Sequence, residues 1–234
     1  MSRTALLNNV DHHDLRVVTR HSAAFGDNIN QVLVFPTEFE EVQREYAIFF
    51  TREGNGRYQA VALLGLDRDE NLFLDAQGWQ ARYVPAARQA GPFVIGVGEG
   101  EPMIRIDLDH PRVSRSEGEP LFLRHGGNSP YLDHVAGVLR TIYRGIELAP
   151  RMFAAFEEAG LIVPVEVGVQ LNQDERYVLP DYHGVSGERL AALEGAALDR
   201  LHRSGFLYPA FLVLASMSNV DRLIARKNAR RAAG

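Results

Sequence analysis

One stretch of the sequence gathers side-chain types that often bind ligands or partners. Between Glu70 and Phe93 the chain reads ENLFLDAQGWQARYVPAARQAGPF, which includes the one tryptophan among its 234 residues. Tryptophan, tyrosine and arginine are enriched at binding hot spots, but large aromatic side chains also fill hydrophobic cores. We therefore expect this stretch to pack in the core and keep ligand binding as the alternative. The candidate ligand-binding residues are Trp79, Tyr83, Arg88, Asn71 and Glu38.

A second group of residues has the types and spacing of metal ligands. His12 and Asp14, separated by one residue, match two of the three ligands of non-haem iron oxygenases, and His183 is a candidate third ligand. Short motifs of this kind also arise by chance, and polar residues in an exposed turn are the simpler interpretation. We therefore predict a protein without a metal or another cofactor, and keep an iron site at these three residues as the alternative.

Two further motifs suggest chemistry that their surroundings do not support. GVGEGE at 96–101 contains the glycines of a nucleotide-binding loop, but Pro102 and the strand-like MIRIDL follow it instead of a helix. Ser186 comes three residues after His183, but it lacks the GxSxG context of a nucleophile elbow. We expect a hairpin loop at the first motif and a helix cap at Ser186.

Charged side chains cluster at two other places. Asp107 and Asp109 alternate with apolar residues in MIRIDLD, so we expect both on the exposed face of a strand. The C-terminal RLIARKNARRAAG is basic, which suits the end of a helix because cations interact favourably with the helix dipole. A patch for nucleic acid or for an acidic partner is the alternative. The basic residues of this segment are Arg222, Arg226, Lys227, Arg230 and Arg231.

The overall composition argues against several classes of protein. The formal net charge of -5 does not attract nucleic acid or anionic lipid in a general way. The absence of cysteine excludes disulfides, thiolate metal sites and cysteine nucleophiles. The longest apolar tract, GFLYPAFLVLASMS, is shorter than the roughly 20 residues that span a membrane, and the N-terminus does not resemble a secretory signal. We expect a soluble protein of the cytoplasm.

The first part of the chain has the pattern of antiparallel β-structure. The apolar runs YAIFF and YQAVALLGL flank Asn55 and Gly56, a pair that favours the tight turn of a hairpin. NLFLD, FVIGV and MIRIDL are three further expected strands. Short helices are expected after a capping box at 37–40 and between a proline and a glycine at 85–91. We expect 1–110 to be mainly β.

The pattern becomes helical near Ser129. Ser129 caps a helix that proline at the next position can start without losing a hydrogen bond. Pro150 is expected to break or kink this helix, and Gly160 to end it. The residues expected on its apolar face are Leu132, Val135, Leu139, Tyr143 and Ile146.

The remaining segments complete an α+β fold. VEVGVQL and RYVL predict a further hairpin around NQDE. Ser186 caps a last well-defined helix, with Leu190, Leu193, Ala197, Leu198 and Leu201 on one face and Gly205 at its end, and the segment up to Arg231 is helical. Strands followed by helices, without sustained alternation, predict an α+β class. We expect 129–231 to be mainly α with one hairpin, and 1–234 to form a single domain with an antiparallel meander, inserted short helices and a helical C-terminal portion.

Several of these motifs together resemble the SapC-like family of bacteria. TEFEEVQREYAIFF, ALLGLDRDENLFLDAQGWQARYVPAARQAGPF, IDLD and EGEPLF occur in the order and spacing of that family. Weaker matches in FEEAGLIVP, LHRSGFLY and LASMSNVDRL extend the resemblance to nearly the whole chain. The chain departs from the family pattern at Ala90 and Gly91, where a larger residue or an arginine is usual.

The resemblance implies a role near peptide uptake. The family name implies resistance to antimicrobial peptides through a peptide ABC transporter, and members are often labelled permeases, a label that the hydropathy of this chain contradicts. The resemblance further implies a gene neighbourhood of TonB-dependent receptors, halogenase-like proteins and cupin-like oxygenases in Gram-negative bacteria. It brings no catalytic residues with it.

These observations lead to one functional hypothesis and two alternatives. We expect an accessory protein that binds a partner protein or a peptide-like ligand, linked by resemblance to peptide uptake and antimicrobial-peptide resistance, and we favour binding over catalysis. The first alternative is a metal-dependent oxygenase-like enzyme or a partner of a tailoring enzyme. The second is a structural role as a homo-oligomer or a complex subunit.

Overall fold

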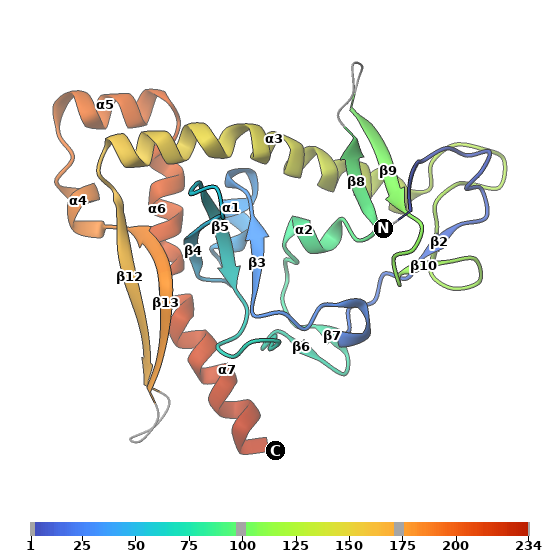
Figure 1. Cartoon of the computed structure of the whole chain (residues 1–234), viewed down its shortest axis with the longest axis horizontal. Coiled ribbons are helices and arrows are strands. Elements are labelled where there is room, and N and C mark those ends of the chain that lie inside the picture. Colours follow the sequence, from blue (N-terminus) through green and yellow to red (C-terminus); the bar gives the residue numbers. More distant parts are fainter. Residues whose placement is uncertain (1–2, 97–101, 171–175, 234) are drawn as a thin grey trace.

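The chain forms an elongated molecule of antiparallel strands and helices (Figure 1). The structure, a computed structural model, describes residues 3–96, 102–170 and 176–233. One long helix, α3 (Pro130–Glu158), runs along the length of the molecule and packs over strands at both of its ends. This helix therefore joins parts of the fold that lie far apart.

The strands and helices follow one another in the order shown in Figure 1. The strands are β1 (Thr4–Leu6), β2 (Arg16–Val17), β3 (Gln31–Val34), β4 (Ile48–Arg52), β5 (Tyr58–Leu63), β6 (Leu74–Asp75), β7 (Gly78–Trp79), β8 (Phe93–Gly96), β9 (Met103–Asp107), β10 (Val113–Ser114), β11 (Glu119–Pro120), β12 (Ile162–Gln170) and β13 (Arg176–Val185). The helices besides α3 are the 3-10 helices η1 (Ala23–Phe25) and η2 (Pro36–Glu38), and α1 (Phe39–Val42), α2 (Ala86–Gln89), α4 (Gly187–Ala191), α5 (Gly195–Arg203), α6 (Leu207–Ser216) and α7 (Asn219–Ala233).

The largest sheet contains both hairpins that the sequence predicts around NG and NQDE. Its strand order is β12-β13-β4-β5-β3, and every neighbouring pair is antiparallel. In the turn between β4 and β5, Gly56 has a φ of 81°, a conformation that glycine adopts without steric cost. The turn of the other hairpin, at 171–175, lies outside the described residues. The second half of the chain thus extends the sheet that the first half begins.

Two smaller sheets form the other end of the molecule. One has the order β1-β9-β8, and the other has the order β10-β2-β11. The pairing of β8 with β9 confirms the hairpin predicted from FVIGV and MIRIDL, while most of the GVGEGE motif, at 97–101, lies outside the described residues. Asp109 is exposed and Asp107 is half-buried, so the predicted solvated face is largely present.

Helix α3 begins where the sequence predicts. The Oγ of Ser129 accepts a hydrogen bond from the backbone N–H of Leu132 at 3.1 Å, the expected capping interaction. The helix does not end at Pro150, although a proline inside a helix removes one hydrogen bond and crowds the preceding turn. Beyond the proline, Phe153 packs edge-on against Phe50 of β4 with ring centroids 5.0 Å apart. This packing holds the second half of the helix against the sheet.

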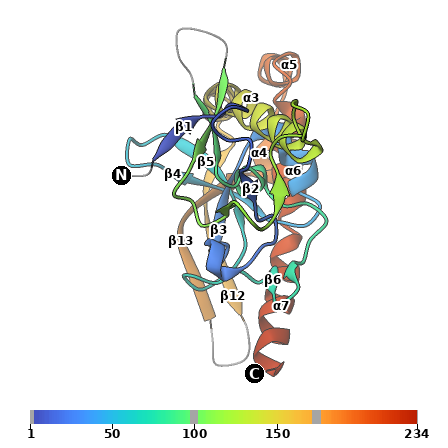
Figure 2. The same ribbon diagram turned by 90° about the vertical axis from the view of Figure 1, so that its right-hand side faces the viewer.

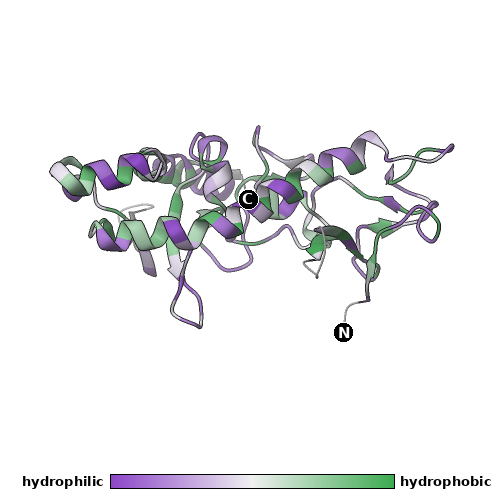
Figure 3. Cartoon of the chain, turned by 90° about the horizontal axis from the view of Figure 1, so that it is seen from above, coloured by the Kyte–Doolittle hydropathy of each residue, from purple (hydrophilic) through white to green (hydrophobic). Residues whose placement is uncertain are grey.

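The buried apolar residues in the described part of the chain form two clusters, and α3 contributes to both. Its C-terminal half supplies Phe156 to the cluster around the five-stranded sheet, and its N-terminal half supplies Leu132 to the cluster around β8 and β9. Ile146, which the helical pattern places on the buried face, is 57% exposed between the two. Seen from above, α3 alternates between hydrophilic and hydrophobic residues, as a helix with one buried face does (Figure 3). We propose that 1–234 is a single domain because both clusters share this helix.

The predicted capping box is wrong in its residues. Thr37 lies inside η2, and its hydroxyl donates a hydrogen bond to the backbone oxygen of Thr141 in α3 at 2.8 Å instead of capping a helix. Glu38 takes the role expected of Glu40, since its Oε1 accepts the backbone N–H of Phe35 at 3.1 Å. Contact with the distant helix α3 therefore overrides the local pattern.

Two other local predictions need correction. The expected strand NLFLD is a strand at Leu74–Asp75 alone, because the Oδ1 of Asn71 accepts the backbone N–H of Phe73 at 2.9 Å and folds the preceding residues into a turn. The helix capped by Ser186 ends at α4, and α5 follows as a separate helix. Leu198 of α5, predicted to be buried, is 38% exposed.

The structure confirms the α+β class. Among the described residues, those of 1–110 form β1 to β9 with short helices between them, and those of 129–231 form α3, one hairpin and four further helices. No helix in the described part of the chain combines the length and the apolar character needed to cross a membrane.

Two glycines of α3 provide a matched test of its packing. A Cβ at Gly145 would lie 2.4 Å from the Cβ of Phe35 and 2.8 Å from the Oγ1 of Thr37, whereas a Cβ at Gly137 would meet nothing within 4 Å. We expect Gly145→Ala to lower the free energy of unfolding by about 1–3 kcal/mol and Gly137→Ala to raise it by up to about 1 kcal/mol. Urea unfolding followed by circular dichroism measures both, and a similar change in the two variants would contradict the close packing of η2 on α3.

Candidate functional site

A buried carboxylate organises the region between α2 and the loop after β9. Asp27, between η1 and β3, has no exposed surface. Its Oδ1 accepts hydrogen bonds from the Nη2 and Nε of Arg88 in α2 at 2.7 and 3.2 Å. Its Oδ2 accepts a hydrogen bond from the Nη2 of Arg112 at 2.6 Å. Charge-assisted hydrogen bonds are stronger than neutral ones, so Asp27 fixes two guanidinium groups side by side.

Neighbouring groups hold this carboxylate in place. The backbone N–H of Ser22 donates to Oδ2 at 2.9 Å, and the Nδ1 of His21 lies 3.2 Å from the same oxygen. The amide nitrogen of Asn71 donates to the backbone oxygen of Asp27 at 2.9 Å. The ring of His21 in turn stands edge-on to Trp79, with ring centroids 5.3 Å apart. Asn71 and Trp79 therefore support the site from behind.

The environment of Asp27 keeps its carboxylate ionised. Burial by itself would raise the pKa of this group, but the hydrogen bonds from His21 and Arg88 and the charge of Arg112 lower the pKa to about 2. A carboxylate that accepts several hydrogen bonds from cations is stabilised in its charged form. Asp27 thus remains a fixed negative charge at neutral pH.

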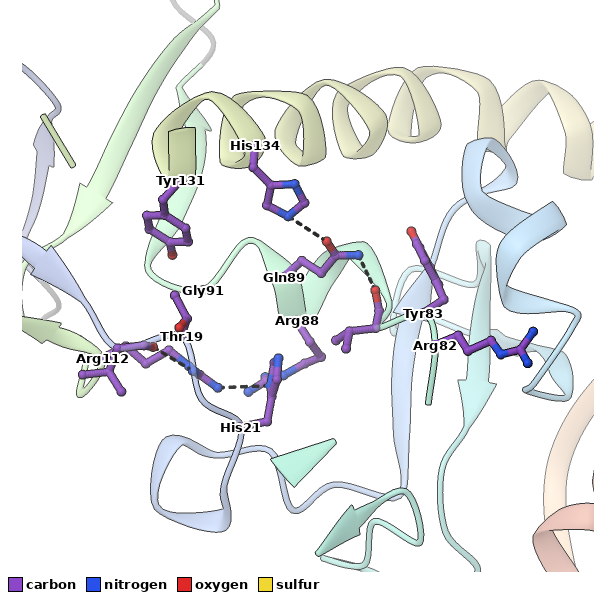
Figure 4. Close-up of a pocket in the computed structure, with 12 residues that line it drawn as sticks. Thr19, His21, Arg82, Tyr83, Arg88, Gln89, Gly91, Arg112, Tyr131 and His134 are labelled. Atoms are coloured by element: carbon purple, nitrogen blue, oxygen red, sulfur yellow. Dashed lines mark hydrogen bonds between the residues drawn. The ribbon is translucent and has the colours of Figure 1, made fainter. Parts of the chain in front are cut away.

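A cavity of about 500 Å³ opens beside Arg88 and Arg112 (Figure 4). Tyr83 borders it on one side, and Tyr131 and His134 of α3 line it on another. Arginines, histidines and tyrosines contribute most of its polar wall, and no carboxylate of the described residues lines it. The ionisable residues that matter most for this cavity are Arg82, Arg88, Arg112, His21, His134 and Tyr131.

Several donors in the cavity wall have no hydrogen-bond partner in the described part of the chain. They are the Nη1 of Arg88, the Nε of Arg112, the guanidinium group of Arg82 and the hydroxyl of Tyr131. Burial raises the pKa of Tyr131 to about 12, so its hydroxyl stays protonated and can donate. The wall therefore offers hydrogen-bond donors and positive charge to whatever enters the cavity.

Tyr83 and Glu38 belong to a network behind the cavity. The hydroxyl of Tyr83 donates to the Oε2 of Glu38 at 2.7 Å, and the backbone N–H of Ala86 donates to the same oxygen at 2.8 Å. Burial raises the pKa of the Glu38 carboxyl, while these hydrogen bonds act in the opposite direction. The hydroxyl of Tyr46 donates to the backbone oxygen of Tyr83 at 2.6 Å, and the Nε1 of Trp79 donates to Tyr46 at 2.8 Å. The network fixes the chain where it enters α2.

The five binding candidates from the sequence thus fall into two groups, those that line the cavity and those that lie behind it. Tyr83 and Arg88 line the cavity. Asn71 and Glu38 are buried in the network that supports it, and Trp79 is half-buried against His21. The structure brings all five into one region, with Tyr83 and Arg88 as the two that reach the cavity.

The three residues considered as iron ligands are not brought together. The Nδ1 of His12 is 3.2 Å from the backbone nitrogen of Asn8, and Asp14 forms an ion pair with Arg115. His183 lies in β13, at the opposite end of the molecule from β2, which follows Asp14 (Figure 1). Among the described residues no three histidines, aspartates or glutamates are grouped so that they could hold a metal ion.

The basic C-terminal helix packs on the chain segment that supports the site. The Nζ of Lys227 contacts Asp67 and lies 2.6 Å from the Oε1 of Glu70. Arg230 donates to the backbone oxygens of Asn71 and Leu74 at 3.1 and 2.7 Å. β6 and α7 lie side by side in both views (Figures 1 and 2). These cations therefore do more than balance the helix dipole, since they hold the segment that carries Asn71.

Most of the central residues of the site could not be identified from the sequence. Asp27, His21, Arg112 and Tyr131 come from three loops and a helix, and no short motif connects them. Arg88 was recognisable because it lies in the block that carries the family resemblance. The capping role predicted for Ser186 is confirmed, since its Oγ accepts the backbone N–H of Arg189 at 3.3 Å.

Fold and site together define an α+β protein with an arginine-lined cavity held by one buried aspartate. The model of the SapC family matches residues 7–223, which is most of the chain. The chain therefore belongs to the SapC family. No curated protein and no solved structure shows significant similarity to it.

Removing the charge of Asp27 tests its central role. We expect Asp27→Asn to lower the free energy of unfolding by about 3–5 kcal/mol, because Arg112 would remain as a buried charge without its partner. Glu40→Gln is the matched control, since the ion pair of Glu40 with Arg44 is exposed and we expect it to contribute less than about 1 kcal/mol. Chemical denaturation of both variants and the parent chain measures the difference, and equal losses would contradict this role.

The lowered pKa of Asp27 also predicts a dependence of stability on pH. Because the pKa falls from its ordinary value of 3.8 to about 2 on folding, the unfolded chain takes up the proton first as the pH decreases. Asp27 should thus contribute its full stabilisation above about pH 4 and lose about 2 kcal/mol between there and about pH 2. Urea unfolding across this range should show a smaller decrease for Asp27→Asn than for the parent chain. A decrease of the same size in both would exclude Asp27 as its source.

Proposed function

We propose that this SapC family protein is a binding protein that takes an anionic, peptide-like ligand into the cavity beside Arg88 and Arg112. The observation that carries the proposal is the excess of positive charge around the cavity. Arg82, Arg88 and Arg112 line it, and Asp27 is the carboxylate that pairs with two of them. In a chain with a formal net charge of -5, this local excess of cations favours an anion.

The fixed geometry of the arginines supports recognition of a carboxylate. Guanidinium groups match the planar shape of a carboxylate and can bind it with paired hydrogen bonds. Because Asp27 already holds Arg88 and Arg112 in position, binding costs little additional ordering of these side chains. The hydroxyl of Tyr131, which has no hydrogen-bond partner among the described residues, supplies one more donor in the same wall.

The size and lining of the cavity suit a short peptide or an amino-acid derivative. Its volume of about 500 Å³ is in the range of sites for small molecules. Val18 and Val84 add apolar surface beside the polar groups. A peptide-like ligand agrees with the link to peptide uptake that the SapC resemblance implies. The proposed role of the protein is therefore that of an accessory to a peptide uptake system.

Binding of short peptides tests the proposal. We expect trialanine with a free C-terminal carboxylate to bind at least about 10-fold more tightly than trialanine amide, since hydrogen bonds to a charged group contribute about 1.5–3 kcal/mol. We expect Tyr131→Phe to weaken trialanine binding without lowering the melting temperature, because the hydroxyl has no partner among the described residues. Isothermal titration calorimetry measures both effects.

A second tyrosine provides the control for this test. Tyr208 in α6 is 56% exposed and lies outside the cavity, so Tyr208→Phe should bind trialanine like the parent chain. Equal affinity for trialanine and its amide would argue against carboxylate recognition. Equal affinity of the Tyr131→Phe and Tyr208→Phe variants would argue against this cavity as the site.

A further inference from the structure

His21 differs from the arginines in the cavity wall because it can accept a hydrogen bond. Its Nδ1 lies 3.2 Å from the Oδ2 of Asp27 and 3.3 Å from the Nη2 of Arg112. An unprotonated Nδ1 would direct its lone pair at the buried carboxylate, so we assign the proton of the neutral imidazole to Nδ1. Nε2 is then an acceptor.

The Nε2 of His21 is free to contact a ligand. It has no hydrogen-bond partner in the described part of the chain. The buried side-chain atoms without a partner among the described residues are Asp14 Oδ1 and His183 Nδ1, so the unpaired Nε2 must be open to solvent. His21 lines the cavity, and Figure 4 shows its ring beside Arg88. An acceptor therefore lies next to the donors that would hold a carboxylate.

The charge of the wall restricts which donor the ligand can present to Nε2. A free ammonium group would enter a cavity where arginines already exceed carboxylates, and like charges in a partly buried site repel each other strongly. A neutral amide N–H avoids this repulsion and still satisfies the acceptor. The donor that fits His21 is thus an uncharged N–H close to the anionic group of the ligand.

Resting on the proposed function, we infer that the cavity recognises an N-acylated α-amino acid, the unit found at the C-terminus of a peptide. Its carboxylate binds the donors of Arg88, Arg112 and Tyr131, and its amide N–H donates to the Nε2 of His21. The two groups are adjacent in such a ligand, as the arginines and the histidine are adjacent in the wall. A free amino acid or a simple carboxylic acid satisfies one half of this arrangement.

Two probes that differ in one atom test the inference. N-acetylalanine carries the amide N–H, and O-acetyllactate has an ester oxygen in its place with the same carboxylate. We expect the parent chain to bind N-acetylalanine at least about 10-fold more tightly, because the ester oxygen leaves Nε2 without a donor. Isothermal titration calorimetry at neutral pH gives both dissociation constants.

A variant of His21 tests whether its Nε2 causes the preference for N-acetylalanine over O-acetyllactate. In His21→Asn the amide nitrogen can take the place of Nδ1 and still donate to Asp27, but no acceptor remains at the position of Nε2. We expect this variant to bind the two probes equally, with the affinity that the parent chain has for the ester. His202, exposed on α5 and outside the cavity, provides the control, and His202→Asn should keep the full preference.

The possible results separate the inference from the proposed function. If both probes bind equally well to the parent chain and Tyr131→Phe weakens both, the carboxylate site stands and the role of His21 is overturned. If neither probe binds, the proposed function itself fails. A preference that persists in His21→Asn would place Nε2 toward the neighbouring hollow lined by Ser22 and Asn28 and would also overturn the inference. The comparison of the two probes on the parent chain requires no variant. It therefore tests whether the cavity prefers an amide N–H even if His21→Asn does not fold.

Discussion

The buried ion pairs of Asp27 are the constraint on which this site depends. One carboxylate without exposed surface holds Arg88 from α2 and Arg112 from the loop after β9, and the backbone at Ser22 and the amide of Asn71 hold Asp27 in turn. Transferring these charges out of water is costly, so their attraction contributes less to stability than its strength suggests. Its main consequence is geometric, because the cavity receives guanidinium groups whose positions are already determined.

This arrangement also explains why the aromatic block contributes both to the core and to the wall of the cavity. Trp79 and Tyr46 form a hydrogen-bonded pair that fixes the backbone at Tyr83, and Trp79 also contacts the ring of His21. The cavity is built on top of this packing. The position of each side chain separates the two roles. Trp79 and Tyr46 pack behind the cavity and support its wall, whereas Tyr83 and Arg88 line the cavity itself.

How far the sequence predicts this protein depends on how local each interaction is. The β4–β5 turn at Asn55 and Gly56 and the cap at Ser129 depend on neighbours within a few residues, and both were predictable. Arg88 and Arg112 reach Asp27 across 61 and 85 positions of the chain, and no periodicity encodes such a contact. Thr37 shows the same limit, since its bond to α3 replaces the capping role that its neighbours favour. The fold class could thus be predicted from the sequence. The residues that line the cavity could not, because contacts between distant parts of the chain bring them together.

The docking of α7 has a consequence for the way the chain is made. Lys227 and Arg230, near the end of the sequence, contact the segment from Asp67 to Leu74 that carries Asn71. Since a ribosome releases the N-terminal part first, Asp27, Arg88 and Arg112 can meet while this support is still missing. Helix α7, which is synthesised after these residues, then packs on the segment that supports them. The support behind the cavity wall is therefore completed only after α7 has been synthesised, more than 100 residues after Arg112.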